Sequence, residues 1–300
     1  MRHIISITDL SADEIKAVVK SAIELKAGLK QPAKQPALPL SNKSMAMIFD
    51  KSSLRTRLSF EIGMTQLGGH AVYLAPDDIK LGVRETVHDS AIVISSMADV
   101  IVARVSSHEA VRELAEYSSV PVINAMTDLE HPCQILADLQ TIYEQFGTFE
   151  GIKLAYLGDA NNNVTNSLAL AAGLLGMELS IAAPKGYEIS PEIAAKAGRL
   201  SQSNDPESAV KGAQVVVTDT WVSMGKETER AERISDLSPF QVNQALMGLA
   251  DKQAIFLHCL PAYRGKEVAA EVIDGPQSAV FAEAENRMHA EKALLLHVLA

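Results

Sequence analysis

The sequence holds 300 residues, of which 47% are hydrophobic and 21% are charged, with a formal net charge of −10 at pH 7. This length suits two α/β domains that each bury a core. The acidic balance argues against nucleic acid or an anionic membrane as the main partner, because both reward basic surfaces. The N-terminus lacks a signal-peptide pattern and no apolar run is long enough to span a bilayer, so we expect a cytoplasmic protein.

The first predicted helix lies within residues 11–30. Its apolar residues recur at helical spacing, at Ile15, Val18, Val19, Ala22 and Ile23. Ser11 and Glu14 are spaced as a capping box at its start. A loop that contains three prolines ends this helix.

Short apolar runs alternate with longer segments of helical pattern along the rest of the chain. The first four runs are Met45–Phe49, Ala71–Leu74, Val100–Ala103 and Val120–Asn124. After a helix predicted over 132–146 and a connector at 147–151, the pattern restarts at 153–157, 178–182, 214–218 and 254–257. Such alternation predicts parallel sheets covered by helices.

We therefore predict an α/β fold with two doubly wound parallel-sheet lobes. The first lobe covers residues 1–146 together with a returning C-terminal helix at 284–300, and the second covers 147–283. Polar clusters follow several of the predicted strands, and ligands of open α/β sheets bind beyond the carboxyl ends of strands. We expect the active site in a cleft between the lobes.

The segment after the first predicted strand, residues 50–57, is typical of a phosphate site. Backbone N–H groups in the first turn of a helix, the hydroxyls of Ser53 and Thr56 and the guanidinium of Arg55 can together surround a dianion. An ordinary capped helix with a basic start is an equally good interpretation of this segment taken alone.

Two further segments place reactive groups next to proline. His131 could donate to a substrate oxygen and Gln134 could bond an amide, although a His-Pro pair is more often simply a helix start. Cys259 follows an apolar strand and precedes Pro261, where we expect extended backbone with free carbonyls. The alternative is that Cys259 is a small buried hydrophobe.

A third cluster, residues 218–225, carries the only tryptophan of the chain. Asp219 could hold or deprotonate an amine, and residues 223–225 could close over a ligand. The alternative is a helix-capping aspartate beside a surface loop. The turn at Gly158 stands where a dinucleotide fold has three glycines, but three asparagines follow it instead and suit a zwitterionic ligand better than a pyrophosphate.

Four of these segments together, residues 53–57, 131–134, 219–225 and 258–261, resemble the aspartate/ornithine carbamoyltransferase family in order and spacing. The resemblance runs from the first helix to residues 285–289. The first two motifs are similar in both branches of the family and concern carbamoyl phosphate. The last two are similar to the ornithine branch, where a carboxylate at Asp219 suits a cationic acceptor.

The resemblance implies the residue roles and the reaction, which is carbamoyl transfer to the side-chain amine of ornithine, giving citrulline and phosphate in arginine biosynthesis. Carbamoyl phosphate would be bound by Ser53, Leu54, Arg55, Thr56, Lys80, Arg104, His131, Gln134, Cys259, Leu260 and Arg287. Ornithine would be bound by Asn163, Asp219, Ser223 and Met224, and the catalytic residues would be Arg104, His131, Asp219 and Cys259. No cofactor or metal is expected.

The resemblance also implies a homotrimer whose active sites are shared between subunits. We expect Arg57 to pair with Glu61 one helical turn later. Two positions depart from the family pattern. Leu54 stands where threonine is usual, which removes one hydroxyl. Lys80 stands where ornithine enzymes often carry glutamine, in a loop that reaches a neighbouring subunit's site in the family, and a lysine there is similar to the aspartate branch.

Other functions stay open at this point. The acceptor could be putrescine, an acylated ornithine or aspartate. A nicotinamide-dependent dehydrogenase fits two α/β lobes but not the broken glycine pattern after the fifth predicted strand. A noncatalytic phosphate-binding module is the third alternative.

Overall fold

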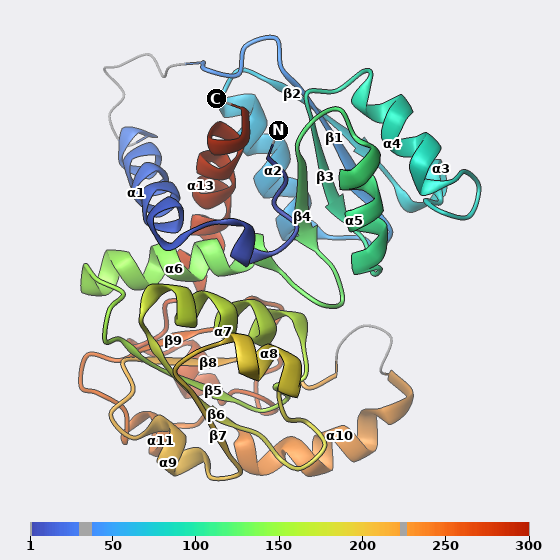
Figure 1. The fold of residues 1–300 in the computed structure, drawn as a ribbon. Helices are drawn as coiled ribbons and strands as arrows, with labels where there is room; N and C mark the ends of the chain where they lie inside the picture. The colour runs from blue at the N-terminus through green and yellow to red at the C-terminus, as the bar shows by residue number, and fades with distance from the viewer. Residues whose placement is uncertain (1, 30–37, 223–226, 300) are drawn as a thin grey trace. The chain divides into compact units, whose positions relative to one another are not determined.

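The computed structural model describes residues 2–29, 38–222 and 227–299, and it shows an α/β fold (Figure 1). The chain forms two compact units, which are Met1–Gln140 with Glu285–Ala300, and Thr141–Ala284. Each unit contains one parallel sheet flanked by helices. The predicted fold class of two doubly wound parallel sheets is confirmed. Among the described residues no helix is long and apolar enough to cross a membrane.

The first unit is built on a four-stranded sheet with the order β2-β1-β3-β4. Its strands are β1 (Ser44–Phe49), β2 (His70–Leu74), β3 (Val100–Arg104) and β4 (Val122–Met126). All their pairings are parallel. The four predicted strands are confirmed, although β4 begins two residues later than expected.

The helices of this unit begin with α1 (Ala12–Leu29), where Ser11 and Glu14 exchange the predicted capping hydrogen bonds. The others are α2 (Leu54–Gln66), α3 (Pro76–Ile79), α4 (Val87–Ser95), α5 (His108–Tyr117), α6 (Pro132–Phe146) and most of α13 (Val280–Leu299). Side chains tie α13 to its neighbours, because Asn286 accepts from Lys26 on α1 and Lys292 donates to Gln66 on α2. The C-terminal helix from Glu285 onward therefore belongs to the first unit.

The second unit is built on a five-stranded parallel sheet with the order β7-β6-β5-β8-β9. Its strands are β5 (Lys153–Leu157), β6 (Glu178–Ala182), β7 (Leu200–Ser203), β8 (Val215–Thr218) and β9 (Ile255–Leu257). The helices are α7 (Asn163–Leu175), α8 (Pro191–Lys196), α9 (Pro206–Val210), α10 (Arg230–Leu237), α11 (Gln244–Met247) and α12 (Ala270–Ile273). Strand β7 is missing from the sequence prediction, because this edge strand is mostly exposed and carries no apolar run.

Both sheets reverse their direction of growth beside their first strand. In the first unit β2 is added on one side of β1, and β3 and β4 are added on the other side. In the second unit β6 and β7 lie on one side of β5, and β8 and β9 lie on the other. Such a switch point leaves a crevice at the carboxyl ends of the two strands that flank it, and this is where open α/β sheets bind ligands.

Candidate functional site

The first group of candidate residues lies at the β1/β3 switch point of the first unit. Helix α2 begins directly after β1, with Ser53 as its N-cap in extended conformation. The Ser53 side chain makes no capping hydrogen bond. The first turn of α2 therefore presents backbone N–H groups and a hydroxyl to the crevice, together with the positive end of the helix dipole.

Two guanidinium groups converge on the hydroxyl of Thr56 in that first turn. Arg104, the last residue of β3, donates from Nη1 to Thr56 Oγ1 at 3.0 Å. Arg287 on α13 donates from Nη2 to the same oxygen at 3.2 Å. All three residues are buried. The fold thus gathers positive charge at Thr56, in a buried region that excludes bulk water. Electrostatic attraction to a bound dianion is stronger there than it would be in water.

Gln134 is held beside this group by both ends of its amide. Its Oε1 accepts from Arg287 Nη1 at 2.7 Å, and its Nε2 donates to Asp138 Oδ1 at 2.8 Å. The network joins the start of α6 to α13. The amide orientation follows from these partners, since oxygen faces the cation and nitrogen faces the carboxylate.

His131, the residue before α6, lies close enough to these arginines for their charges to affect its protonation. Burial lowers the pKa of His131 well below its ordinary value, and the positive charges of Arg287, Arg104 and Arg55 lower this pKa further. The imidazole is therefore neutral around pH 7. A neutral imidazole can donate one hydrogen bond from its protonated nitrogen, but it does not add a positive charge to the site.

The remaining candidates of this unit lie at its surface. The side chain of Leu54 is 74% exposed, so this residue offers the site its backbone rather than its side chain. Arg57 donates to Glu61 at 3.2 Å, as predicted, and its guanidinium also lies over the ring of Tyr73. Lys80 adopts a left-handed conformation with φ of 43° at the end of α3, and its Nζ lies 4.0 Å from Asp77.

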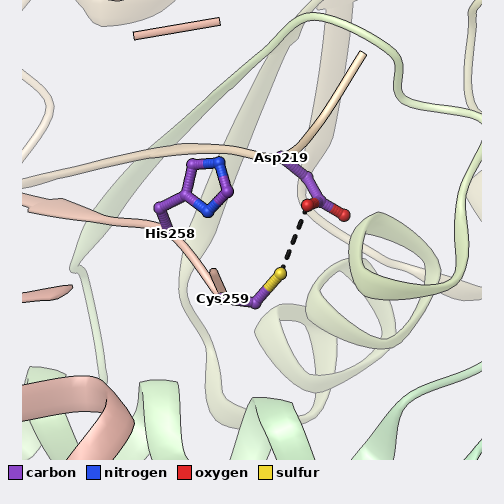
Figure 2. Close-up of side chains that lie close together, drawn as sticks. All are labelled: Asp219, His258 and Cys259. Carbon is purple, nitrogen blue, oxygen red and sulfur yellow. Dashed lines mark hydrogen bonds between the residues drawn. The ribbon is translucent and has the colours of Figure 1, made fainter. Parts of the chain in front are cut away.

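The second group lies at the β5/β8 switch point of the second unit and on the strand next to it. Asp219 directly follows β8, and Cys259 follows β9. Cys259 Sγ donates to Asp219 Oδ1 at 3.2 Å (Figure 2), and the backbone N–H of Thr220 donates to the same oxygen at 2.7 Å. No helix begins at Asp219, so the alternative interpretation as a helix cap is wrong. The arrangement presents a thiol and a carboxylate together.

His258 completes a cluster with Asp219 and Cys259 whose potential ligand atoms all lie within 4.8 Å of one another. Imidazole, thiolate and carboxylate form a donor set that suits a transition metal. However, His258 Nδ1 already accepts the N–H of Leu260 at 2.9 Å, and its Nε2 lies 3.4 Å from Glu267. Nδ1 is therefore engaged in the turn that follows β9, whereas Nε2 is buried next to the Glu267 carboxylate without a hydrogen bond among the described residues.

That turn corrects one expectation from the sequence. Leu260 was expected to be extended before Pro261, but its φ is 57°, in the left-handed region. The hydrogen bond from the Leu260 N–H back to His258 turns the chain at this residue. A left-handed conformation is rare for leucine and is found most often at functional sites.

In the asparagine turn after β5, Asn162 stabilises the local structure and Asn163 is a candidate for binding ligand. Asn162 caps α7, because its Oδ1 accepts from the Thr165 N–H at 2.9 Å while its Nδ2 donates to the Asp159 carbonyl. Asn163, the first residue of α7, is half-buried. Two candidates for ornithine, Ser223 and Met224, lie outside the described residues.

A buried ion pair between Arg233 and Asp159 ties the two turns of this unit together, and the sequence pattern does not reveal it. Arg233 on α10 donates to the carboxylate of Asp159, after β5, and to the carbonyl of Trp221, after β8. Asp159 also accepts the N–H of Asn161 at 3.0 Å. The arginine lies in an amphipathic surface helix, so its pattern alone resembles that of any solvated cation.

Comparison with protein families identifies both units. Residues 2–144 match the carbamoyl-P binding domain of aspartate/ornithine carbamoyltransferase, and residues 150–298 match the Asp/Orn binding domain. The chain belongs to the aspartate/ornithine carbamoyltransferase family. Thr56 and Arg104 lie in the carbamoyl-P match, whereas Arg287, their partner in the first compact unit, lies near the end of the Asp/Orn match. The pair formed by Asp219 and Cys259 also lies in the Asp/Orn match.

Individual relatives agree with the family match over nearly the whole chain. The ornithine carbamoyltransferase of Methanosarcina mazei is 50% identical, with 99% of each chain covered. The structure of ornithine carbamoyltransferase from Pyrococcus furiosus is similar with a TM-score of 0.94 and 45% identity, covering 99% of this chain and 97% of that one. The anabolic ornithine carbamoyltransferase from Campylobacter jejuni is similar with a TM-score of 0.92 and 44% identity, covering 99% of each chain.

The buried pair of Arg233 and Asp159 predicts a large effect on the stability of this chain. Arg233→Met keeps much of the side-chain volume but leaves the Asp159 carboxylate buried without its partner, which is expected to lower the free energy of unfolding by about 3–5 kcal/mol. Denaturant unfolding followed by circular dichroism measures this change.

Arg264→Met is the matched control, because the Arg264 pair with Asp274 is exposed and is expected to contribute little to the free energy of unfolding. Equal losses in the two variants would show that the buried pair does not hold the two turns.

Proposed function

We propose that this protein transfers the carbamoyl group of carbamoyl phosphate to the side-chain amine of L-ornithine, giving L-citrulline and phosphate. The observation that carries the choice of acceptor is the Asp219 carboxylate at the switch point of the Asp/Orn binding domain. A carboxylate there attracts the cationic side chain of ornithine and repels the side-chain carboxylate of aspartate. The names of the relatives support the same acceptor.

The cationic group in the carbamoyl-P binding domain supports the donor half of this proposal. We assign the phosphate to the start of α2 and β3, namely Ser53, the Leu54 backbone, Arg55, Thr56 and Arg104. We assign the carbamoyl group to His131, Gln134 and Arg287, with Cys259 and the Leu260 carbonyl as further contacts. Charge-assisted hydrogen bonds from guanidinium groups suit both a phosphate and a polarised carbonyl.

In the proposed reaction the neutral amine nitrogen of ornithine attacks the carbonyl carbon. A C–N bond forms, the C–O bond to phosphate breaks, and the amine proton leaves with the basic phosphate. An alkylamine like that of lysine has a pKa of about 10.4, so most of the free substrate is charged at neutral pH. A nearby carboxylate raises an amine pKa, and Asp219 therefore orients the acceptor rather than deprotonating it.

Charge that develops on the carbonyl oxygen in the tetrahedral intermediate is stabilised by groups that are already in place. Arg104 and Arg287 hold Thr56 between them, and neutral His131 can donate a hydrogen bond without adding charge. Removing one such donor from a preorganised site typically raises the barrier by about 2.7–4 kcal/mol.

We assign the ornithine half to Asp219 and Asn163, together with Ser223 and Met224. Asp219 begins the turn after β8, and Asn163 ends the turn after β5 as the first residue of α7, so both lie beyond the carboxyl ends of the strands that flank the switch point of this unit. The Asp219 carboxylate would hold the amine end, while the amide of Asn163 would suit the α-amino acid end. We place the reaction in arginine biosynthesis in the cytoplasm, where a reducing environment suits the free thiols of Cys133 and Cys259.

A homotrimer with shared active sites is part of this proposal, and Lys80 would complete the site of a neighbouring subunit. Its support is an exposed apolar stripe formed by Leu54, Leu58 and Ile62 on one face of α2, beside Val72 on the edge strand β2. Exposed apolar patches next to a sheet edge are typical of interfaces between chains.

Leu58→Glu tests this interface, because a charge on the stripe must be desolvated when chains associate. We expect the wild type to sediment as a trimer and the variant as a smaller species with at least tenfold lower activity per chain. The expected folded state of the variant is checked by its circular dichroism. A wild-type protein that is fully active as a monomer would contradict the shared site.

A steady-state assay with carbamoyl phosphate and an acceptor panel tests the reaction itself. We expect ureido product from ornithine at a kcat/KM at least a hundredfold above that from putrescine, N-acetylornithine or aspartate, since only ornithine satisfies both Asp219 and a site for the α-amino acid group. Preference for another acceptor would overturn the assignment, and the absence of any transfer would favour a noncatalytic module.

Asp219→Asn tests whether Asp219 acts on the binding of ornithine rather than on that of carbamoyl phosphate. Loss of the charged partner is expected to raise the KM for ornithine about ten- to hundredfold and to change the KM for carbamoyl phosphate by less than about threefold. Initial rates measured while each substrate is varied in turn give both constants.

Asp205→Asn is the matched control in the same unit, because Asp205 caps α9 and asparagine caps helices equally well. Equal losses for both substrates in Asp219→Asn would contradict its place in the acceptor half.

A further inference from the structure

A buried carboxylate on α13 has no role in the site described so far. Glu291 is 1% exposed and lies one helical turn after Arg287. Its Oε1 accepts from Arg287 Nε at 3.1 Å and from Arg287 Nη2 at 2.8 Å. No described residue hydrogen-bonds its Oε2. An ionisable group that is buried in this way is expensive to keep charged.

The contacts of Glu291 fix the direction of the Arg287 guanidinium. A guanidinium is planar with five N–H donors in fixed directions. One edge of Arg287 faces Glu291, and its other donors reach Gln134 Oε1 at 2.7 Å and Thr56 Oγ1 at 3.2 Å. Turning the plane to follow a different partner would break the contacts with Gln134 and Thr56, which both belong to the carbamoyl phosphate half.

The environment of Glu291 brings its titration close to neutral pH. Burial raises the pKa of Glu291 to about 7, against the opposing effects of Arg287, the Ser59 hydroxyl and Arg104. These groups face it from α13, α2 and β3, and from α6 it faces the Cys133 thiol, whose pKa is raised by burial and by the charge of Glu291. The carboxylate is ionised above about pH 7 and becomes protonated below it.

We propose that Glu291 is a positioning residue whose carboxylate sets the Arg287 guanidinium for the carbamoyl group and whose protonation weakens that hold. This inference rests on the proposed function, since it assigns Arg287 to carbamoyl phosphate. Ionised Glu291 accepts two charge-assisted hydrogen bonds from Arg287, whereas the protonated acid is a weaker acceptor.

If ionised Glu291 sets Arg287 for binding, a ligand binds the ionised form more tightly than the protonated form. By reciprocity, binding then lowers the pKa of Glu291, and binding near pH 7 releases a fraction of a proton. Repulsion between a bound dianion and the carboxylate acts in the opposite direction. Net proton uptake by Glu291 would therefore show that repulsion outweighs positioning and would overturn the inference.

Binding of phosphonoacetamide, in which a methylene group replaces the bridging oxygen of carbamoyl phosphate, tests this inference without ornithine and its own titration. Isothermal titration calorimetry in buffers of different ionisation enthalpy gives both the affinity and the number of protons released or taken up on binding. We expect Glu291→Gln to bind roughly tenfold more weakly than the wild type at about pH 8, because glutamine holds Arg287 less firmly. At about pH 6 the difference should shrink, because the wild-type carboxyl is then protonated.

Two further variants make the result specific. Glu291→Asp keeps an ionisable group and should retain the pH-dependent part of the affinity, whereas Glu291→Gln should lose the corresponding proton release. Glu14→Gln is the matched control on the same unit, because Glu14 pairs with Arg2 and not with Arg287, and its binding should equal that of the wild type.

The outcomes separate this inference from the proposed function. An affinity ratio between wild type and Glu291→Gln that is the same at both pH values would show a purely structural role and would overturn the inference alone. A wild-type protein that neither binds the analogue nor makes citrulline would overturn the proposed function and the inference together.

Discussion

The reversal of strand order beside β1 and beside β5 is the constraint on which both candidate sites depend. In the first unit it places the start of α2 next to the end of β3, so that Thr56 and Arg104 meet although they are 48 residues apart. In the second unit it places the turn after β5 next to the turn after β8. The same topology therefore gathers guanidinium groups in one unit and a carboxylate beside a thiol in the other, where we propose an anion site and an amine site respectively.

The proposed anion site brings several positive charges close together. Buried guanidinium groups repel one another when no ligand is bound, and the pKa of His131 is lowered in part by their charge. The carboxylate of Glu291 compensates part of this positive charge within the same buried region. Burial makes the ionisation of Glu291 itself less favourable. A neutral residue in place of Glu291 would remove a repulsion of the bound dianion, but it would also leave Arg287 without a fixed direction, and we expect the second effect to be the larger.

Most of the architecture could be predicted from the sequence, because buried parallel strands are continuous apolar runs and their helices are amphipathic. Strands β5 and β6 and helix α6 begin and end where predicted. The prediction fails where the apolar pattern carries no information about the backbone. Edge strand β7 has no apolar run to detect, and Leu260 leaves the extended form where the imidazole of His258, two residues earlier, accepts its N–H.

The same distinction separates the site residues that could be predicted from those that could not. A residue directly after a strand, such as Asp219, stands out because a polar group interrupts a buried apolar run, whereas Arg104 was expected only from the resemblance to the family. Glu291 and Arg233 lie within helices that carry many charges, where a sequence pattern cannot tell a buried ion pair from a solvated one. Their roles can be inferred only when the three-dimensional structure shows which partner each charge faces. For Glu291 that partner is Arg287, which we propose to contact the carbamoyl group.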